Sequence, residues 1–85
     1  MNDLIGKNVF VRTVTTYFTG TLVSVGDGFA ALDDASWVAD TGRFADALAK
    51  GMLSEVEPYP GSVFVSLGAI VDVCEWAHDL PRTQK

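Results

Sequence analysis

A glycine interrupts the longest β-type run in the sequence and limits the kind of sheet that this chain can build. Residues 17–25 are rich in the β-branched and aromatic residues that are typical of strands. Gly20 lies inside this run, where a glycine relieves crowding at a bend or a bulge. The run therefore predicts a strongly curved strand, as a small barrel requires, in place of a flat sheet.

The other β-type runs are short and are separated by turn residues. Gly26 and Gly28 flank Asp27 in a tight turn, and Pro58 and Pro60 stiffen a second turn. The expected strands are residues 8–14, 17–25, 29–39, 62–66 and 70–76, with a short edge strand at 52–56. The fold class is therefore mainly β, a five-stranded, strongly bent open barrel.

One short helix is expected between the third and fourth strands, within an insert at about residues 37–56. Asp40 or Thr41 is suited to cap its first turn. Phe44 and Leu48 are four positions apart and share one helix face. About two turns are too few for a helix to be stable alone. Phe44 and Leu48 are therefore expected to dock on the barrel or on a neighbouring subunit.

Length and charge restrict the architecture and the partners. The 85 residues form a single domain, 1–85, with a flexible tail at about 78–85. A core this small is thin, and 48% hydrophobic residues are more than a small monomer easily buries, so oligomerisation is expected. The formal net charge of −5 disfavours nucleic acid as a partner, because phosphate contacts need a basic surface.

Cysteine usage and the lack of targeting signals indicate a cytoplasmic protein. The single cysteine, Cys74, lies in an apolar strand pattern and is expected to be a buried structural thiol. The first residues lack the basic region and apolar run of a signal peptide. No stretch approaches the ~20 apolar residues of a membrane span.

The sequence contains no pattern that indicates an enzyme. Asp33 and Asp34 are neighbours on a strand, so their side chains point to opposite faces and do not form a catalytic pair. His78 is the only histidine and has no positioned partner. Neither a nucleophile-elbow motif nor a metal-ligand spacing is present. We expect no catalytic residue, no metal and no cofactor.

Two segments resemble the motifs of the Sm-like protein family. Residues 18–35 combine a glycine in a bent strand, a turn, an apolar strand and an acidic close, which is similar to the first motif. Residues 63–73 place two apolar strands around Gly68, which is similar to the second. The layout also resembles small phage-related proteins of Sm-like fold. The resemblance implies a homo-oligomeric ring of about five to seven subunits, in a bacterial host cell if the chain is phage-encoded.

The resemblance also implies an RNA site, and this chain departs from it. Sm-like rings commonly stack a base on an aromatic after the second strand, read it with an asparagine, and add an arginine after the fourth strand. Here Phe29 is present, but no asparagine follows it, and Leu67 and Gly68 have no arginine beside them. Together with the acidic charge, these departures disfavour RNA, although stacking contributes about 1–3 kcal/mol per base.

The preferred hypothesis is a non-enzymatic ring that acts as a scaffold or a protein-binding module. Its alternative is a ring that binds short RNA or nucleotides through pore or insert residues, namely Phe29, Trp37 and Arg43. Within the insert, assembly is favoured over binding of an anionic group by Arg43 and over a merely local cap. The expected subunit interface comprises Asp40, Arg43, Phe44, Leu48, Val63, Val65, Val71 and Val73.

Overall fold

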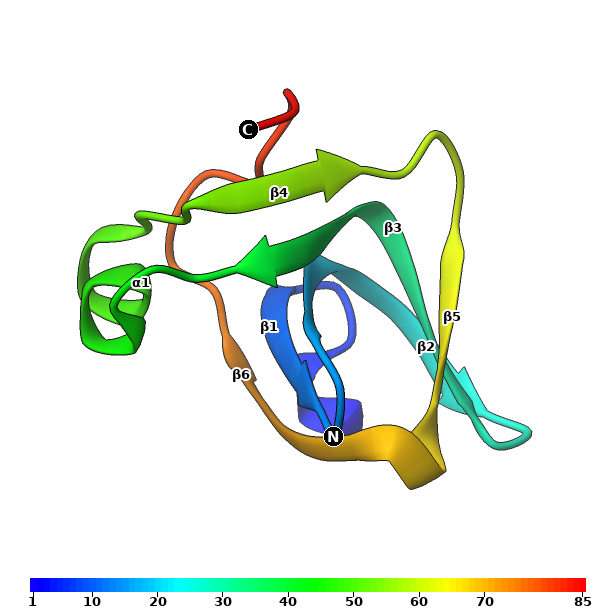
Figure 1. Ribbon diagram of the computed structural model, residues 1–85. Coiled ribbons are helices and arrows are strands. Elements are labelled where there is room, and N and C mark those ends of the chain that lie inside the picture. Colours follow the sequence, from blue (N-terminus) through cyan, green and yellow to red (C-terminus); the bar gives the residue numbers. More distant parts are fainter.

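The computed structural model describes all of residues 1–85. Its strands form one antiparallel sheet that curls into an open barrel (Figure 1). No helix has the length and apolar character needed to cross a bilayer. The short helical turns are η1 (Asn2–Leu4) and η2 (Leu67–Ala69), and the one α-helix is α1 (Phe44–Lys50). The strands are β1 (Asn8–Thr13), β2 (Tyr17–Gly26), β3 (Phe29–Asp40), β4 (Glu55–Pro58), β5 (Val63–Ser66) and β6 (Ile70–Glu75).

Strand β3 organises the sheet because it pairs with three other strands. One edge pairs with β2, while the other pairs with β5 over residues 29–32 and with β4 over residues 36–40. Strands β4 and β5 therefore act as one bent strand, interrupted around residues 59–62. This arrangement confirms the predicted five-stranded, strongly bent barrel with a helix between its third and fourth strands. The expected edge strand at 52–56 begins later, at Glu55.

The bend occurs at Gly20, as the sequence predicts. A Cβ atom added there would lie 3.1 Å from the Asp33 carbonyl oxygen and 3.2 Å from the Ala35 Cα. The pairing register between β2 and β3 shifts at the same place. Gly20 thus allows β2 to approach β3 more closely than any residue with a side chain would.

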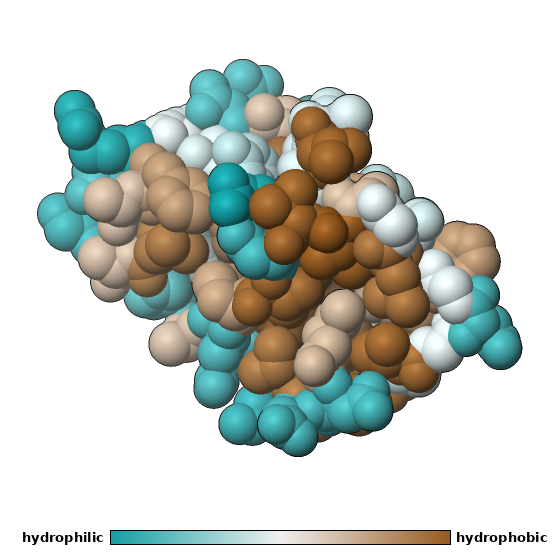
Figure 2. Space-filling model, turned by 90° about the horizontal axis from the view of Figure 1, so that it is seen from below, coloured by the Kyte–Doolittle hydropathy of each residue, from teal (hydrophilic) through white to brown (hydrophobic).

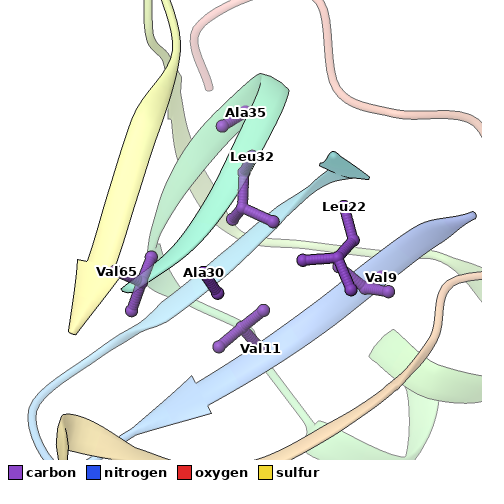
Figure 3. Packing of buried hydrophobic residues seen from close by; sticks show 7 residues of the cluster. All are labelled: Val9, Val11, Leu22, Ala30, Leu32, Ala35 and Val65. Carbon is purple, nitrogen blue, oxygen red and sulfur yellow. The ribbon is translucent and has the colours of Figure 1, made fainter. Parts of the chain in front are cut away.

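The sheet has hydrophobic clusters on both of its faces, and β1 contributes to each. Val9 and Val11 point into the barrel, whereas Phe10 between them points to the opposite face. Figure 3 shows the barrel cluster, which consists of Val9, Val11, Leu22, Ala30, Leu32, Ala35 and Val65. The second cluster consists of Phe10, Val38, Ala47, Leu53, Val56, Trp76 and Leu80.

Helix α1 covers the second cluster. Ala47 is fully buried there, and the Phe44 ring centroid lies 6.1 Å from that of Phe10. Phe10 also stacks between Tyr17 and Trp76, at 5.5 Å from each. The helix therefore docks on the barrel of its own chain, which is one of the two expected alternatives. It gives the outer face of the bent sheet an apolar cover.

The start of α1 differs from the prediction. Arg43 occupies the N-cap position and makes no side-chain capping bond. The expected caps act in the preceding turn, where the Asp40 carboxylate accepts the Gly42 N–H at 2.8 Å and the Thr41 hydroxyl donates to the Gly42 carbonyl. A bend at residues 42–43 delays the helix, so these side chains are too early in the chain to cap it.

One further expectation requires correction, and the structure also shows where the residues of the expected tail lie. Cys74 is exposed, not buried, because its register opposite Phe10 turns it to the outside of β6. The residues expected to form a flexible tail from His78 onward lie against the sheet. Leu80 is buried in the second cluster, and the backbone of Lys85 pairs with that of Val56. Leu80 is buried because the outer face of the sheet has an apolar surface against which it packs.

Replacement of Gly51 by alanine is predicted to destabilise the fold. Gly51 ends α1 with φ 71°, and an added Cβ would lie 2.7 Å from the His78 ring. The left-handed backbone alone costs about 1–2 kcal/mol for a residue with a side chain. We expect Gly51→Ala to lower the free energy of unfolding in urea by at least that amount. Gly26→Ala, at a site with open space, is the control and should change it by less than about 0.5 kcal/mol.

Candidate assembly surface

Two strands of the barrel have an unpaired edge. β5 pairs only with β3, and β6 pairs only with β1, so one edge of each strand has no partner strand. The two strands are consecutive in the chain and are joined by η2. An exposed strand edge presents unpaired N–H and C=O groups and readily accepts another strand. The barrel therefore offers two docking edges, one on each side of its opening.

An apolar hollow lies beside the free edge of β6. It has a volume of about 450 Å³ and is lined by Met1, Leu4, Leu67, Ile70, Val71, Asp72 and Val73. Figure 2 shows apolar side chains gathered on this face of the molecule, with polar residues around them. Val71, one of the lining residues, is 52% exposed. Contiguous exposed apolar surface of this kind is typical of an interaction site.

The other free edge carries Phe64, which the sequence analysis did not single out. Phe64 is 66% exposed on β5, with Val63 and Val65 on the opposite face. It is more exposed than any other aromatic residue among the exposed large hydrophobic side chains. The alternation in Val63-Phe64-Val65 was the available signal, because valines that face a core place the residue between them outside.

The one charged residue of the hollow is neutralised by a neighbour. Arg12 on β1 donates from Nε to both Asp72 carboxylate oxygens, at 3.1 and 3.2 Å, and also from a terminal nitrogen. The hydrogen bond to the guanidinium lowers the pKa of Asp72, and its charge acts in the same direction. Asp72 is thus ionised and paired, which removes a bare charge from an otherwise apolar surface.

The predicted interface residues from the last two strands differ in how far their side chains are exposed. Val65 is 5% exposed and belongs to the barrel core, so its side chain has no surface to offer a neighbour. Val63 and Val73 are half-buried and pack against that core. Val71 is exposed and lines the hollow. The structure thus brings Val71 and Val73 together with η1 and η2 at the barrel opening.

The predicted interface residues from the insert lie elsewhere. Asp40 bonds to Gly42 and forms no ion pair with Arg43 within its own chain. Phe44 and Leu48 remain 43% and 38% exposed, although Phe44 contacts the second cluster. Helix α1 lies on the opposite side of the molecule from β5 (Figure 1), whereas its Phe44 contacts Phe10, which pairs with Cys74 near the end of β6. Phe44 and Leu48 form a second, smaller exposed apolar surface.

The three predicted ligand-binding residues do not form one site. Phe29 begins β3, and Trp37 lies eight positions further along it, which corresponds to about 26 Å of extended strand. The Trp37 indole N–H donates to the Thr16 hydroxyl at 2.7 Å. Arg43 lines a separate hollow beside α1 that contains neither aromatic.

The turn between β2 and β3 and the helical turn η2, where the sequence resemblance led us to expect an RNA site, meet in this chain. The Leu67 N–H donates to the Gly28 carbonyl at 2.9 Å, which joins the β2–β3 turn to η2. Phe29 stands beside this contact and is 47% exposed. The only charged residue of the turn is Asp27, so the loops form an aromatic and acidic site without a cation.

The Arg12–Asp72 pair predicts a measurable titration. Because the folded-state pKa of Asp72 is lowered, the stabilisation it contributes is present above the unfolded-state value and is lost as the pH falls through the folded-state value. We expect the Asp72 carboxyl, followed by carbon NMR, to titrate below the ordinary aspartate value. Arg12→Gln should return it to the ordinary range near 4. An Asp72 midpoint that is unchanged by Arg12→Gln would contradict the pairing.

Comparisons with known proteins support the fold. Neither a protein-family model nor a curated protein sequence matches the chain. The solved SmAP1 heptamer of P. aerophilum is 21% identical over 87% of this chain and 84% of its own, with a TM-score of 0.64. A second heptameric archaeal Sm protein is 21% identical over 87% of this chain and 91% of its own, with a TM-score of 0.63. The chain therefore has an Sm-like fold.

Proposed function

We propose that this protein assembles into a homo-oligomeric ring and acts as a non-enzymatic scaffold or protein-binding module. The observation that carries the proposal is the pair of free edges, β5 and β6, together with an apolar hollow beside the β6 edge. β5 of one copy would pair with β6 of the next, which satisfies both edges. The barrel opening would then be closed by the neighbouring subunit.

The geometry of this contact favours a closed ring over a dimer. The two edges are different surfaces, so the contact is head-to-tail, and such contacts close into rings when the rotation between copies permits. The two archaeal proteins of similar fold are heptamers. Their assembly supports the upper end of the expected range of about five to seven copies. Phe64, at the free edge of β5, would come to lie beside the neighbour's hollow.

The distribution of charge supports a protein partner over nucleic acid. Four of the six cationic side chains are already paired with carboxylates, namely Lys7, Arg12, Lys50 and Arg82. No basic stripe remains for a phosphate backbone, which dominates nucleic-acid affinity. The phage origin and the cytoplasmic location stay predictions from the sequence.

Mutation of Phe64 tests this assembly. Native mass spectrometry of the wild type should show one oligomer of about seven 9.1 kDa chains. Phe64→Asp places a charge in each interface and should cost about 2–4 kcal/mol per contact, which shifts the protein toward monomer. Leu48→Asp, at an exposed position of α1, is the control and should leave the oligomer intact. A wild-type monomer, or a ring lost only in Leu48→Asp, would refute assembly through β5 and β6.

A second candidate function is binding of short RNA or nucleotides, favoured by the contact between the two loops beside Phe29. In a ring, this contact would repeat once per subunit. Because Arg43 and Trp37 lie elsewhere, we expect Phe29→Ala alone to weaken binding of oligo-U or oligo-A in low salt, by about 1–3 kcal/mol per stacked base. Fluorescence anisotropy measures this, and Arg43→Ala should have no effect. Absence of binding by the wild-type ring would exclude the function.

A further inference from the structure

The end of the segment that follows β6 pairs by backbone hydrogen bonds with the outer edge of β4. This segment, residues 79–85, is called the strap below. The Lys85 N–H donates to the Val56 carbonyl at 2.9 Å, and the Val56 N–H donates to the Lys85 carbonyl at 3.2 Å. Reciprocal bonds of this kind define a hydrogen-bonded antiparallel pair. Figure 1 shows the chain rising past α1 to reach β4.

Side chains anchor the strap at three further points, one of which is the Lys85 ammonium group that donates to the Leu53 carbonyl at 2.8 Å. Leu80 is 7% exposed and completes the second cluster. Arg82 pairs with Asp34 at 3.2 Å, and both side chains are exposed to solvent. Between these anchors, the Ser36 hydroxyl donates to the Pro81 carbonyl at 3.4 Å. One apolar anchor, two cationic side chains and a short stretch of backbone pairing thus hold the strap.

The strap fills its groove incompletely. Three hollows, of about 320, 280 and 150 Å³, are lined in part by strap residues. Only one of its residues, Leu80, is buried, and the strap has no helix or strand of its own. Few buried contacts and an exposed ion pair give low local stability, so this segment opens at a small free-energy cost.

We propose that the groove along β4 is a peptide-binding site that the strap occupies in the free chain. The partner is an extended segment of another protein, with a large aliphatic residue in the place of Leu80 and a cation in the place of Arg82. Such a segment would add to the β4 edge by backbone bonds, with alternate side chains giving specificity. The acidic residues Asp34, Glu55 and Glu57 on β3 and β4 favour a cationic segment. Neither β5 nor β6 takes part, so the site operates with or without a ring.

The test uses the full chain and a fluorescent peptide of the strap sequence, Asp-Leu-Pro-Arg-Thr-Gln-Lys. Because the strap competes with the peptide, the apparent affinity rises with the fraction of open groove. We expect Arg82→Ala to tighten peptide binding about two- to fivefold, and Leu80→Ala about tenfold or more. Arg12→Ala, which removes an exposed paired arginine at β1 and β6, is the matched control and should leave the affinity unchanged.

A groove variant identifies where the peptide binds. Asp34 has φ 50°, a conformation that asparagine also tolerates, so Asp34→Asn removes the charge and keeps the backbone. Combined with Arg82→Ala, it should weaken binding of the strap peptide about two- to fivefold. A peptide with glutamine in place of its arginine should bind Arg82→Ala and the double variant with equal affinity. Equal loss for both peptides would overturn the assigned contact.

Hydrogen exchange at the Val56 amide gives a direct readout. In Arg82→Ala and Leu80→Ala, this amide should exchange faster than in the wild type, and saturating peptide should slow it again. Faster exchange that the peptide does not reverse would overturn the proposal, as would peptide binding that leaves Val56 unaffected. If Leu80→Ala unfolds, Arg82→Ala decides, because its side chain is exposed. These outcomes test peptide binding at the β4 groove only. Whether the ring forms is tested independently by native mass spectrometry.

Discussion

The close approach of β2 to β3 at Gly20 is the constraint on which the rest of the molecule depends. Without a side chain there, the two strands bend together, and β3 presents one half of its second edge to β5 and the other half to β4. The first half of β3, paired with β5, closes a small barrel, and the second half of β3, paired with β4, extends beyond that barrel. Both the free edges and the groove along β4 follow from this one curvature.

A bent sheet that extends past its own barrel has two faces to cover, and this explains the helix in a β protein. Phe10 alternates with Val9 and Val11, so its ring lies outside the barrel and would meet water without α1 and the strap. Burial of apolar surface contributes about 25 cal/mol per Å². For a chain with so thin a core, a second cluster roughly as populous as the first is a substantial share of the stability.

The sequence predicted the strands, the glycine bend and the inserted helix, because each depends on local residue type and spacing. The prediction failed where the burial of a residue depends on which face of the curved sheet its side chain lies on. Cys74 looked buried in an apolar run, yet its register opposite Phe10 turns it outward. Phe64 was not singled out, although the alternation of Val63, Phe64 and Val65 places its side chain outside while Val65 enters the barrel core. Phe29 and Trp37 share a strand, but curvature and length separate them.

The apolar hollow beside β6 has a thermal consequence. Its lining is hydrophobic apart from Asp72, whose charge is held by Arg12. Contacts made over such a surface draw on the release of water from apolar groups, and that driving force weakens on cooling. Most ion-paired interfaces respond to salt, whereas one closed over this hollow would respond chiefly to temperature. Apolar contacts between subunits joined there would weaken on cooling and strengthen on warming.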